Sequence, residues 1–152
     1  MKTYTADRPY SRLLYTSVLN AGQSAESPEQ IARKIAATSA ELNRQADLTG
    51  SLVFVDGTFI QILEGPLAEV EKTFERICCD FRHVDVRLID VVNVSDRLFA
   101  DWDMACLCED ADTSVKLREG LQEIRFLVGI NVSQAALQMR GLLDNQSAAG
   151  NI

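Results

Sequence analysis

The sequence has no run of about 18 apolar residues, the length that a membrane-spanning helix requires, and no apolar signal segment follows Lys2. Basic residues are also scarce, since 15 Lys and Arg stand against 22 Asp and Glu and leave a net charge of −7. Proteins that bind the nucleic-acid backbone need clustered cations to displace its counterions. We therefore expect an acidic cytoplasmic protein that binds neither nucleic acid nor a membrane.

Metal-ligand spacings and nucleotide-binding motifs are missing as well. His83 is the single histidine, and the cysteines occur as Cys78-Cys79 and Cys106-x-Cys108, neither of which is a zinc spacing. Small buried thiols in a reducing compartment are the simpler interpretation, with a metal site as the alternative. The chain has no GxGxxG, P-loop, HExxH or GxSxG motif. A phosphate-bearing cofactor would have to use cations that are otherwise only exposed helix residues: Arg33, Lys34, Arg44 and Arg82.

What is present predicts one domain with a substantial core, because 47% of the 152 residues are apolar and 24% are charged. Residues 12–18 carry β-branched and aromatic side chains and predict a first strand. Ser27 and Gln30 have the spacing of a capping box, and Pro28 suits the first helical position. A helix is therefore predicted from Pro28 to about Asn43.

A β-hairpin is the clearest element in the sequence. Two apolar segments, residues 48–55 and 58–64, are joined by Asp56-Gly57, and both turn residues tolerate the positive φ of a tight hairpin turn. The apolar spacing that follows predicts a second helix over residues 67–80.

Two further strands are predicted over residues 84–92 and 98–108. The order β-α-β-β-α-β-β is that of a ferredoxin-like α+β fold with one extra strand, in which both helices pack on the same face of the sheet. Beyond the last strand we expect two short helices, one over residues 115–128 and a second capped by Asn131 or Ser133.

One polar side chain of the hairpin breaks the apolar pattern. Gln61 shares a strand face with Phe59 and Leu63, so its amide needs hydrogen-bond partners or a polar ligand if that face is buried. Tyr15 and Ser17 share a face of the first strand, and the Tyr15 hydroxyl is a plausible partner for the Gln61 amide. The alternative is that Gln61 lies on an exposed face.

Two other groups have adequate structural explanations. Trp102 and Met104 would alternate on one face of the last strand, as core residues of an amphipathic strand do. Asp80, Arg82 and His83 end the second helix, where basic groups complement the helix dipole. A lone histidine without a nucleophile is poor evidence for catalysis.

Five blocks of the sequence stand out together: LLYTS at 13–17, the helix ending in Asn43, LTGSLVFVDGTFIQILEGP at 48–66, DFRH at 80–83 and RLFADWDM at 97–104. These blocks resemble the BLUF family, the sensors of blue light using FAD. They occur in the order and with the spacings of that family over residues 12–107, and the hairpin block and the last block together make the resemblance specific.

The resemblance implies FAD held between the two helices, over the sheet. Tyr15 matches the photoactive tyrosine, Gln61 the switching glutamine and Asn43 the asparagine that binds the flavin ring; Tyr10 is the alternative to Tyr15. Leu42 departs from the pattern, because many members carry a polar residue there. The cofactor-binding residues implied are Tyr15, Ser17, Ile31, Arg33, Ser39, Asn43, Gln61, Leu63, Ile77, Asp80, Arg82 and His83.

The resemblance also implies a mechanism. Tyr15 would give an electron and a proton to the light-excited flavin through Gln61, and the Gln61 amide would be left rotated or tautomerised with a stronger hydrogen bond to flavin O4. Rearrangement of Trp102 and Met104 would pass the signal outward.

We accordingly expect a non-enzymatic photosensor at residues 12–107, a helical output or oligomer surface at 108–144, and flexible ends at 1–11 and 145–152. The segment outside the sensor is too short for an effector domain, so the signal would go to a separate effector protein through the C-terminal helices or the outer sheet face, and the chain would form a homo-oligomer. The alternatives are a flavin-free interaction module and an acyl-phosphate hydrolase. The hydrolase would need a positively charged cradle for its anionic substrate beside a strand–helix turn, and the loop at residues 20–26 has no basic residue.

Overall fold

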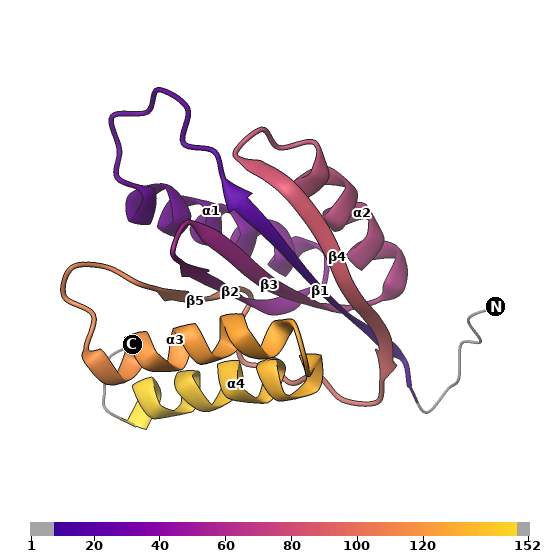
Figure 1. The fold of residues 1–152 in the computed structure, drawn as a ribbon. Helices are drawn as coiled ribbons and strands as arrows, with labels where there is room; N and C mark the ends of the chain where they lie inside the picture. Colours follow the sequence, from indigo (N-terminus) through magenta and orange to yellow (C-terminus); the bar gives the residue numbers. More distant parts are fainter. Residues whose placement is uncertain (1–7, 149–152) are drawn as a thin grey trace.

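The computed structural model describes residues 8–148 and confirms the predicted fold class (Figure 1). A five-stranded mixed sheet has the strand order β4-β1-β3-β2-β5, in which β5 is parallel to β2 and the other neighbours are antiparallel. The elements are β1 (Tyr10–Leu19), α1 (Pro28–Gln45), β2 (Thr49–Val55), β3 (Thr58–Gly65), α2 (Leu67–Cys78), β4 (His83–Val94), β5 (Ala105–Cys108), α3 (Val115–Val128) and α4 (Val132–Ala148).

The sheet separates two layers of helices. Helices α1 and α2 cover one face, and the antiparallel pair α3 and α4 lies on the other (Figure 1). Because alternate strand residues point to opposite faces, each strand contributes to two cores. Leu13 and Leu63 pack in the core beneath α1 and α2, whereas Leu14 and Ile62 pack in the core beneath α3 and α4.

The local signals at α1 and at the hairpin form as predicted. The Ser27 hydroxyl accepts a hydrogen bond from the Gln30 amide nitrogen at 3.2 Å, and the Gln30 side chain accepts one from the Ser27 nitrogen at 2.9 Å. Asp56 and Gly57 both have positive φ, at 50° and 74°, as a two-residue hairpin turn of this kind requires. The turn fixes the register between β2 and β3.

The predicted last strand is wrong over most of its length, because only Ala105–Cys108 of the segment 98–108 is a strand. We call residues 97–104 the connecting segment. Its backbone is held by groups outside a strand ladder: the Glu64 carboxylate accepts hydrogen bonds from the nitrogens of Leu98 and Phe99, and the Trp102 carbonyl accepts one from Gly50. These partners replace the ladder bonds that a strand would need.

The predicted flexible ends are also too long. At the N-terminus, Tyr10 and Ser11 belong to β1 and pair with Val94 and Asn93 of β4. At the C-terminus, α4 continues through Ala148, and the Asn131 side chain caps it by accepting a hydrogen bond from the Gln134 nitrogen at 3.2 Å. Residues 1–7 and 149–152 lie outside the described residues.

Candidate functional site

A buried tyrosine–glutamine pair lies at the centre of the face that α1 and α2 cover. Tyr15 of β1 and Gln61 of β3 are directly opposite each other, and their side chains are 0% and 1% exposed. The Tyr15 hydroxyl donates a hydrogen bond to Gln61 Oε1, and Gln61 Nε2 lies 3.6 Å from Met104 Sδ. Gln61 is therefore not on an exposed face. Tyr10, the alternative tyrosine, packs instead against Arg97, whose guanidinium carbon lies 4.7 Å from the Tyr10 ring centroid.

The interior raises the pKa of Tyr15 above its ordinary value. Burial is the main cause, and the nearby Cys78 and Asp80 add to it because they disfavour a second negative charge. Tyr15 consequently keeps its proton at neutral pH and acts as the donor to Gln61.

Asn43, near the end of α1, has an unsatisfied acceptor. Its side chain is 1% exposed, and its Nδ2 donates to the Asp103 carbonyl at 2.8 Å. Its Oδ1, however, accepts no hydrogen bond from any described residue. A buried polar atom without a partner costs about 1–3 kcal/mol, so this oxygen indicates a ligand that brings an N–H or O–H donor.

His83, the first residue of β4, closes the same face. Its Nδ1 hydrogen-bonds the Ser17 hydroxyl at 2.7 Å, and its ring lies 4.8 Å from the Phe59 ring centroid. Burial lowers the pKa of His83, Asp80 opposes this shift and Arg82 reinforces it. The imidazole is therefore neutral at pH 7 and serves as a hydrogen-bonding group, not as a cation.

An ion pair lies beside His83, at the rim of the site. Arg82 contacts the Asp80 carboxylate at 2.6 Å, and this hydrogen-bonded pairing lowers the pKa of Asp80 despite partial burial. Arg82 itself is exposed, so the pair presents one positive and one negative group beside His83.

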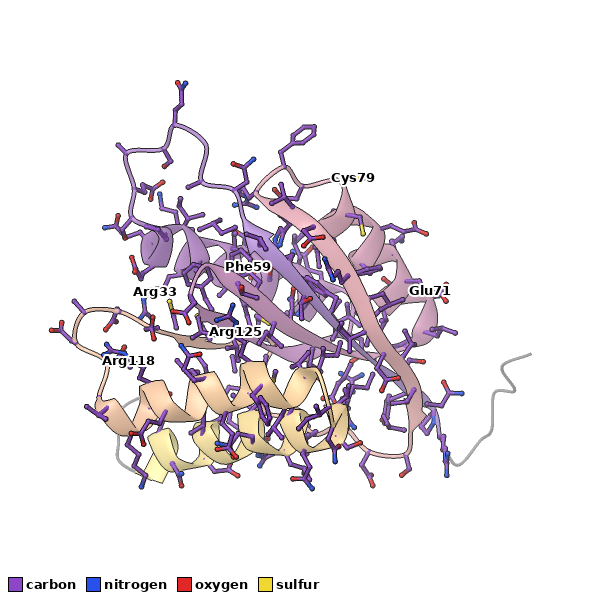
Figure 2. All side chains as sticks on the ribbon, in the orientation of Figure 1. Arg33, Phe59, Glu71, Cys79, Arg118 and Arg125 are labelled. Carbon is purple, nitrogen blue, oxygen red and sulfur yellow. The ribbon has the colours of Figure 1, made fainter. Side chains whose placement is uncertain are left out.

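The other predicted contact residues divide into two groups. Ile31, Leu63 and Ile77 belong to the same buried core as Tyr15, and Ser39 is half-buried on α1. Arg33 is elsewhere: it pairs with Asp110 at 2.9 Å and lines a cavity of about 610 Å³ with Cys106, Cys108 and Lys116. Figure 2 shows it beside the loop between β5 and α3. The structure thus does not bring Arg33 together with Tyr15 and Gln61.

Trp102 and Met104 do not share a face, contrary to the prediction. Met104 is buried in the core with Tyr15 and contacts Gln61. Trp102 packs against the core under α3 and α4, where the Arg140 guanidinium lies 5.0 Å from its ring centroid. The cause is that the connecting segment is not a strand, so the alternation of side chains does not apply to it.

The sequence interpretation missed a buried carboxylate. Glu64 of β3 is 0% exposed and accepts hydrogen bonds from Arg12 Nε at 2.7 Å, from the Leu98 nitrogen at 2.8 Å and from the Phe99 nitrogen at 2.7 Å. A signal for it was present, because Glu64 follows Ile60 and Ile62 on one strand face, where a charge is out of place.

No helix between residues 8 and 148 is both long and apolar enough to cross a membrane. In the same part of the chain, no three or more His, Cys, Asp or Glu side chains are grouped as metal ligands would be.

Comparison with known proteins gives consistent matches. The model of the BLUF family, described as sensors of blue light using FAD, matches residues 10–105. The photoactivated adenylate cyclase subunit beta of Euglena gracilis is 31% identical over 106 residues, which cover 69% of this chain and 10% of that protein. The blue light- and temperature-regulated antirepressor BluF of Escherichia coli K12 is 43% identical over 44 residues, 29% of this chain and 11% of that protein. The chain thus spans about a tenth of the length of the curated relatives that it matches.

Two solved structures have the same fold. The dark-state structure of BlrB, a BLUF protein, superposes with a TM-score of 0.66 at 24% identity and covers 88% of this chain and 96% of that one. The photo-activated state of BlsA has a TM-score of 0.62, also at 24% identity, over 83% of this chain and 81% of that one. At this identity the likeness shows the shared fold.

Proposed function

Because the chain belongs to the BLUF family of sensors of blue light using FAD, we propose that Tyr15 and Gln61 form its light-dependent switch and that a separate protein receives the signal. The family assignment makes FAD the cofactor and blue-light sensing the function. The observation that supports the specific residues is the buried Tyr15–Gln61–Met104 chain of contacts.

The residues between α1 and α2 fit a flavin ring. The unpartnered Asn43 Oδ1 is an acceptor, and the flavin ring carries an imide N–H that can donate to it. The apolar side chains of Ile31, Leu63 and Ile77 would contact the ring, and the Asp80–Arg82 pair would border it. When bound, FAD supplies the absorption of blue light and, in its excited state, a strong electron acceptor.

The Gln61 amide has two alternative orientations with different partners. In the structure, its oxygen accepts a hydrogen bond from the Tyr15 hydroxyl and its nitrogen faces the Met104 sulfur. Turning the amide by half a rotation would present the nitrogen to Tyr15 Oη and the oxygen to Met104. Met104 Sδ has no hydrogen to donate, so the two orientations differ by a whole hydrogen bond, which contributes about 0.5–1.5 kcal/mol net, a difference small enough to be shifted by light. The signal is then stored in hydrogen bonds, without a chemical product.

The connecting segment would carry the change outward. It contacts the switch through Met104 and contacts Asn43 through the Asp103 carbonyl. On the output side, α3 and α4 expose large apolar side chains, among them Phe126 at 67% and Leu137 at 53%. Exposed apolar groups beside charged ones suit a protein partner, either an effector or a second copy of the chain.

The test is absorption spectroscopy of the purified, FAD-loaded protein. Blue light should shift the flavin absorption slightly to the red, with recovery in the dark. Tyr15→Phe and Gln61→Leu should retain FAD and lose the shift, because each removes one member of the buried pair. Gln45→Leu is the matched control, since Gln45 is exposed on α1 and should leave the shift unchanged.

Two results would contradict the proposal. A shift that persists in Tyr15→Phe or Gln61→Leu would show that these residues are not the switch. A colourless protein that does not take up FAD would favour a flavin-free interaction module instead.

A further inference from the structure

The connecting segment is attached to the flavin side of the sheet by two side chains. Asn43 Nδ2 donates to the Asp103 carbonyl at 2.8 Å, and Gln61 Nε2 lies 3.6 Å from Met104 Sδ. Both attachments come from residues assigned above to the cofactor and the switch. A change at either residue therefore acts directly on Asp103 and Met104.

On the opposite face of the sheet, one residue of α4 holds the same segment at two points. Arg140 Nη1 donates to the Leu98 carbonyl at 2.6 Å, and its guanidinium lies 5.0 Å from the Trp102 ring centroid. Its Nε pairs with Asp144 one turn further along α4 at 3.0 Å, which orients the guanidinium toward the segment. Arg140 thus links the connecting segment with α4.

The remaining contacts of α4 are of a different kind. Ala136, Met139 and Leu143 pack in the core on this face of the sheet, with Leu14 and Ile62 of the strands and with Phe99 of the connecting segment. The contacts with the strands would keep α4 docked in either state of the switch. The ring contact of Arg140, by contrast, requires that Trp102 lie on the α4 side.

Trp102 and Met104 are separated by a single residue, Asp103, whose carbonyl is held by Asn43. A displacement of Met104 that moves its backbone is therefore passed through Asp103 to Trp102, the ring that Arg140 contacts.

We propose that Arg140 is a positioning residue that couples the state of the connecting segment to the stability of α4. This inference rests on the proposed function, since it takes the light-dependent change at Gln61 as its input. When the segment moves, Arg140 loses its carbonyl and ring contacts, and α4 opens more often while its core contacts stay in place.

The experiment is hydrogen–deuterium exchange of the FAD-loaded full chain, in the dark and under blue light, read over residues 132–148. In the wild type, illumination should speed exchange in α4 several-fold. Arg140→Gln should keep the red shift of the flavin, exchange quickly already in the dark and show little further change in light. Emission from Trp102, the single tryptophan, should differ between Arg140→Gln and the wild type in the dark.

Arg125→Gln is the matched control. Arg125 lies on α3 (Figure 2) and pairs with Asp56 at 3.0 Å, away from the connecting segment. It removes the same charge and should retain the wild-type response. Arg140→Lys keeps a cation and a single donor nitrogen and should restore part of the light-dependent difference, which a loss of folding alone would not allow.

The outcomes separate this inference from the proposed function. A red shift with no light-dependent exchange in wild-type α4, or an unchanged light–dark difference in Arg140→Gln, would overturn the role of Arg140 and leave the switch intact. Absence of the red shift in the wild type would overturn the proposed function and this inference with it.

Discussion

Replacing the buried Glu64 carboxylate by an amide should destabilise the protein strongly. In the wild type, Glu64 Oε2 accepts from Arg12 Nε and from the Leu98 nitrogen, while Oε1 accepts from the Phe99 nitrogen. Glu64→Gln keeps the shape of the side chain but leaves only one acceptor oxygen. In the better of its two orientations, this oxygen retains the donors from Arg12 and Leu98, and the new NH₂ group faces the Phe99 N–H.

The magnitude follows from these contacts. One buried N–H without a partner costs about 1–3 kcal/mol, and two hydrogen bonds that change from an ionic to a neutral acceptor each weaken by about 1 kcal/mol. The sum is about 3–5 kcal/mol, the range found when one member of a buried ion pair is removed. The Arg12 side chain is 22% exposed, so water can hydrogen-bond its guanidinium and offset part of the weakened bond to residue 64. We therefore expect a loss in the lower half of this range.

Urea unfolding in the dark, with equal excess FAD, measures this difference. With a slope of about 2 kcal/mol per molar urea, the midpoint of Glu64→Gln should fall by about 1.5–2 M. Glu41→Gln is the control: the Glu41 side chain is 56% exposed in its pair with Arg44, so the change should cost less than about 1 kcal/mol. A loss below about 1 kcal/mol in Glu64→Gln would refute the reasoning from buried hydrogen bonds.

Two further predictions concern the flavin side. Asn43→Ala should weaken FAD binding roughly three- to tenfold, the effect of one net hydrogen bond, as measured by fluorescence titration; unchanged affinity would exclude Asn43 Oδ1 as a contact. Burial lowers the pKa of His83 in the folded state, so the unfolded chain binds the proton first as the pH falls below about 6.5. The free energy of unfolding should therefore decrease below that pH and stay constant above it; His83→Gln should remove this slope in urea titrations, and an unaltered slope would assign it to another group.

Much of the site followed from short-range patterns in the sequence. Alternation along a strand puts Tyr15 with Ser17, and Gln61 with Phe59, whatever the rest of the chain does. The Asp56-Gly57 turn is equally local, and it determines the hairpin register. These patterns depend on residues a few positions apart, and the structure reproduces them.

The connecting segment shows where such patterns fail. Its apolar residues resemble those of a strand, and the sequence predicts one from residue 98 to residue 108. The Glu64 carboxylate, 34 and 35 positions away from Leu98 and Phe99, accepts the hydrogen bonds of their N–H groups. Local periodicity contains no information about a partner at that distance.

By itself, the sequence determined the elements outside the connecting segment, the pairing of Tyr15 and Gln61 with their neighbours on a strand face, and the family resemblance, because these depend on local periods, turns and spacings. Only the tertiary structure decided that Met104 lies against Gln61 while Trp102 lies under Arg140, and that Arg33 pairs with Asp110. The physical reason is that buried polar groups must find partners, and in a folded chain these partners come from elements far apart in the sequence: Glu64 from β3, Asn43 from α1 and Arg140 from α4.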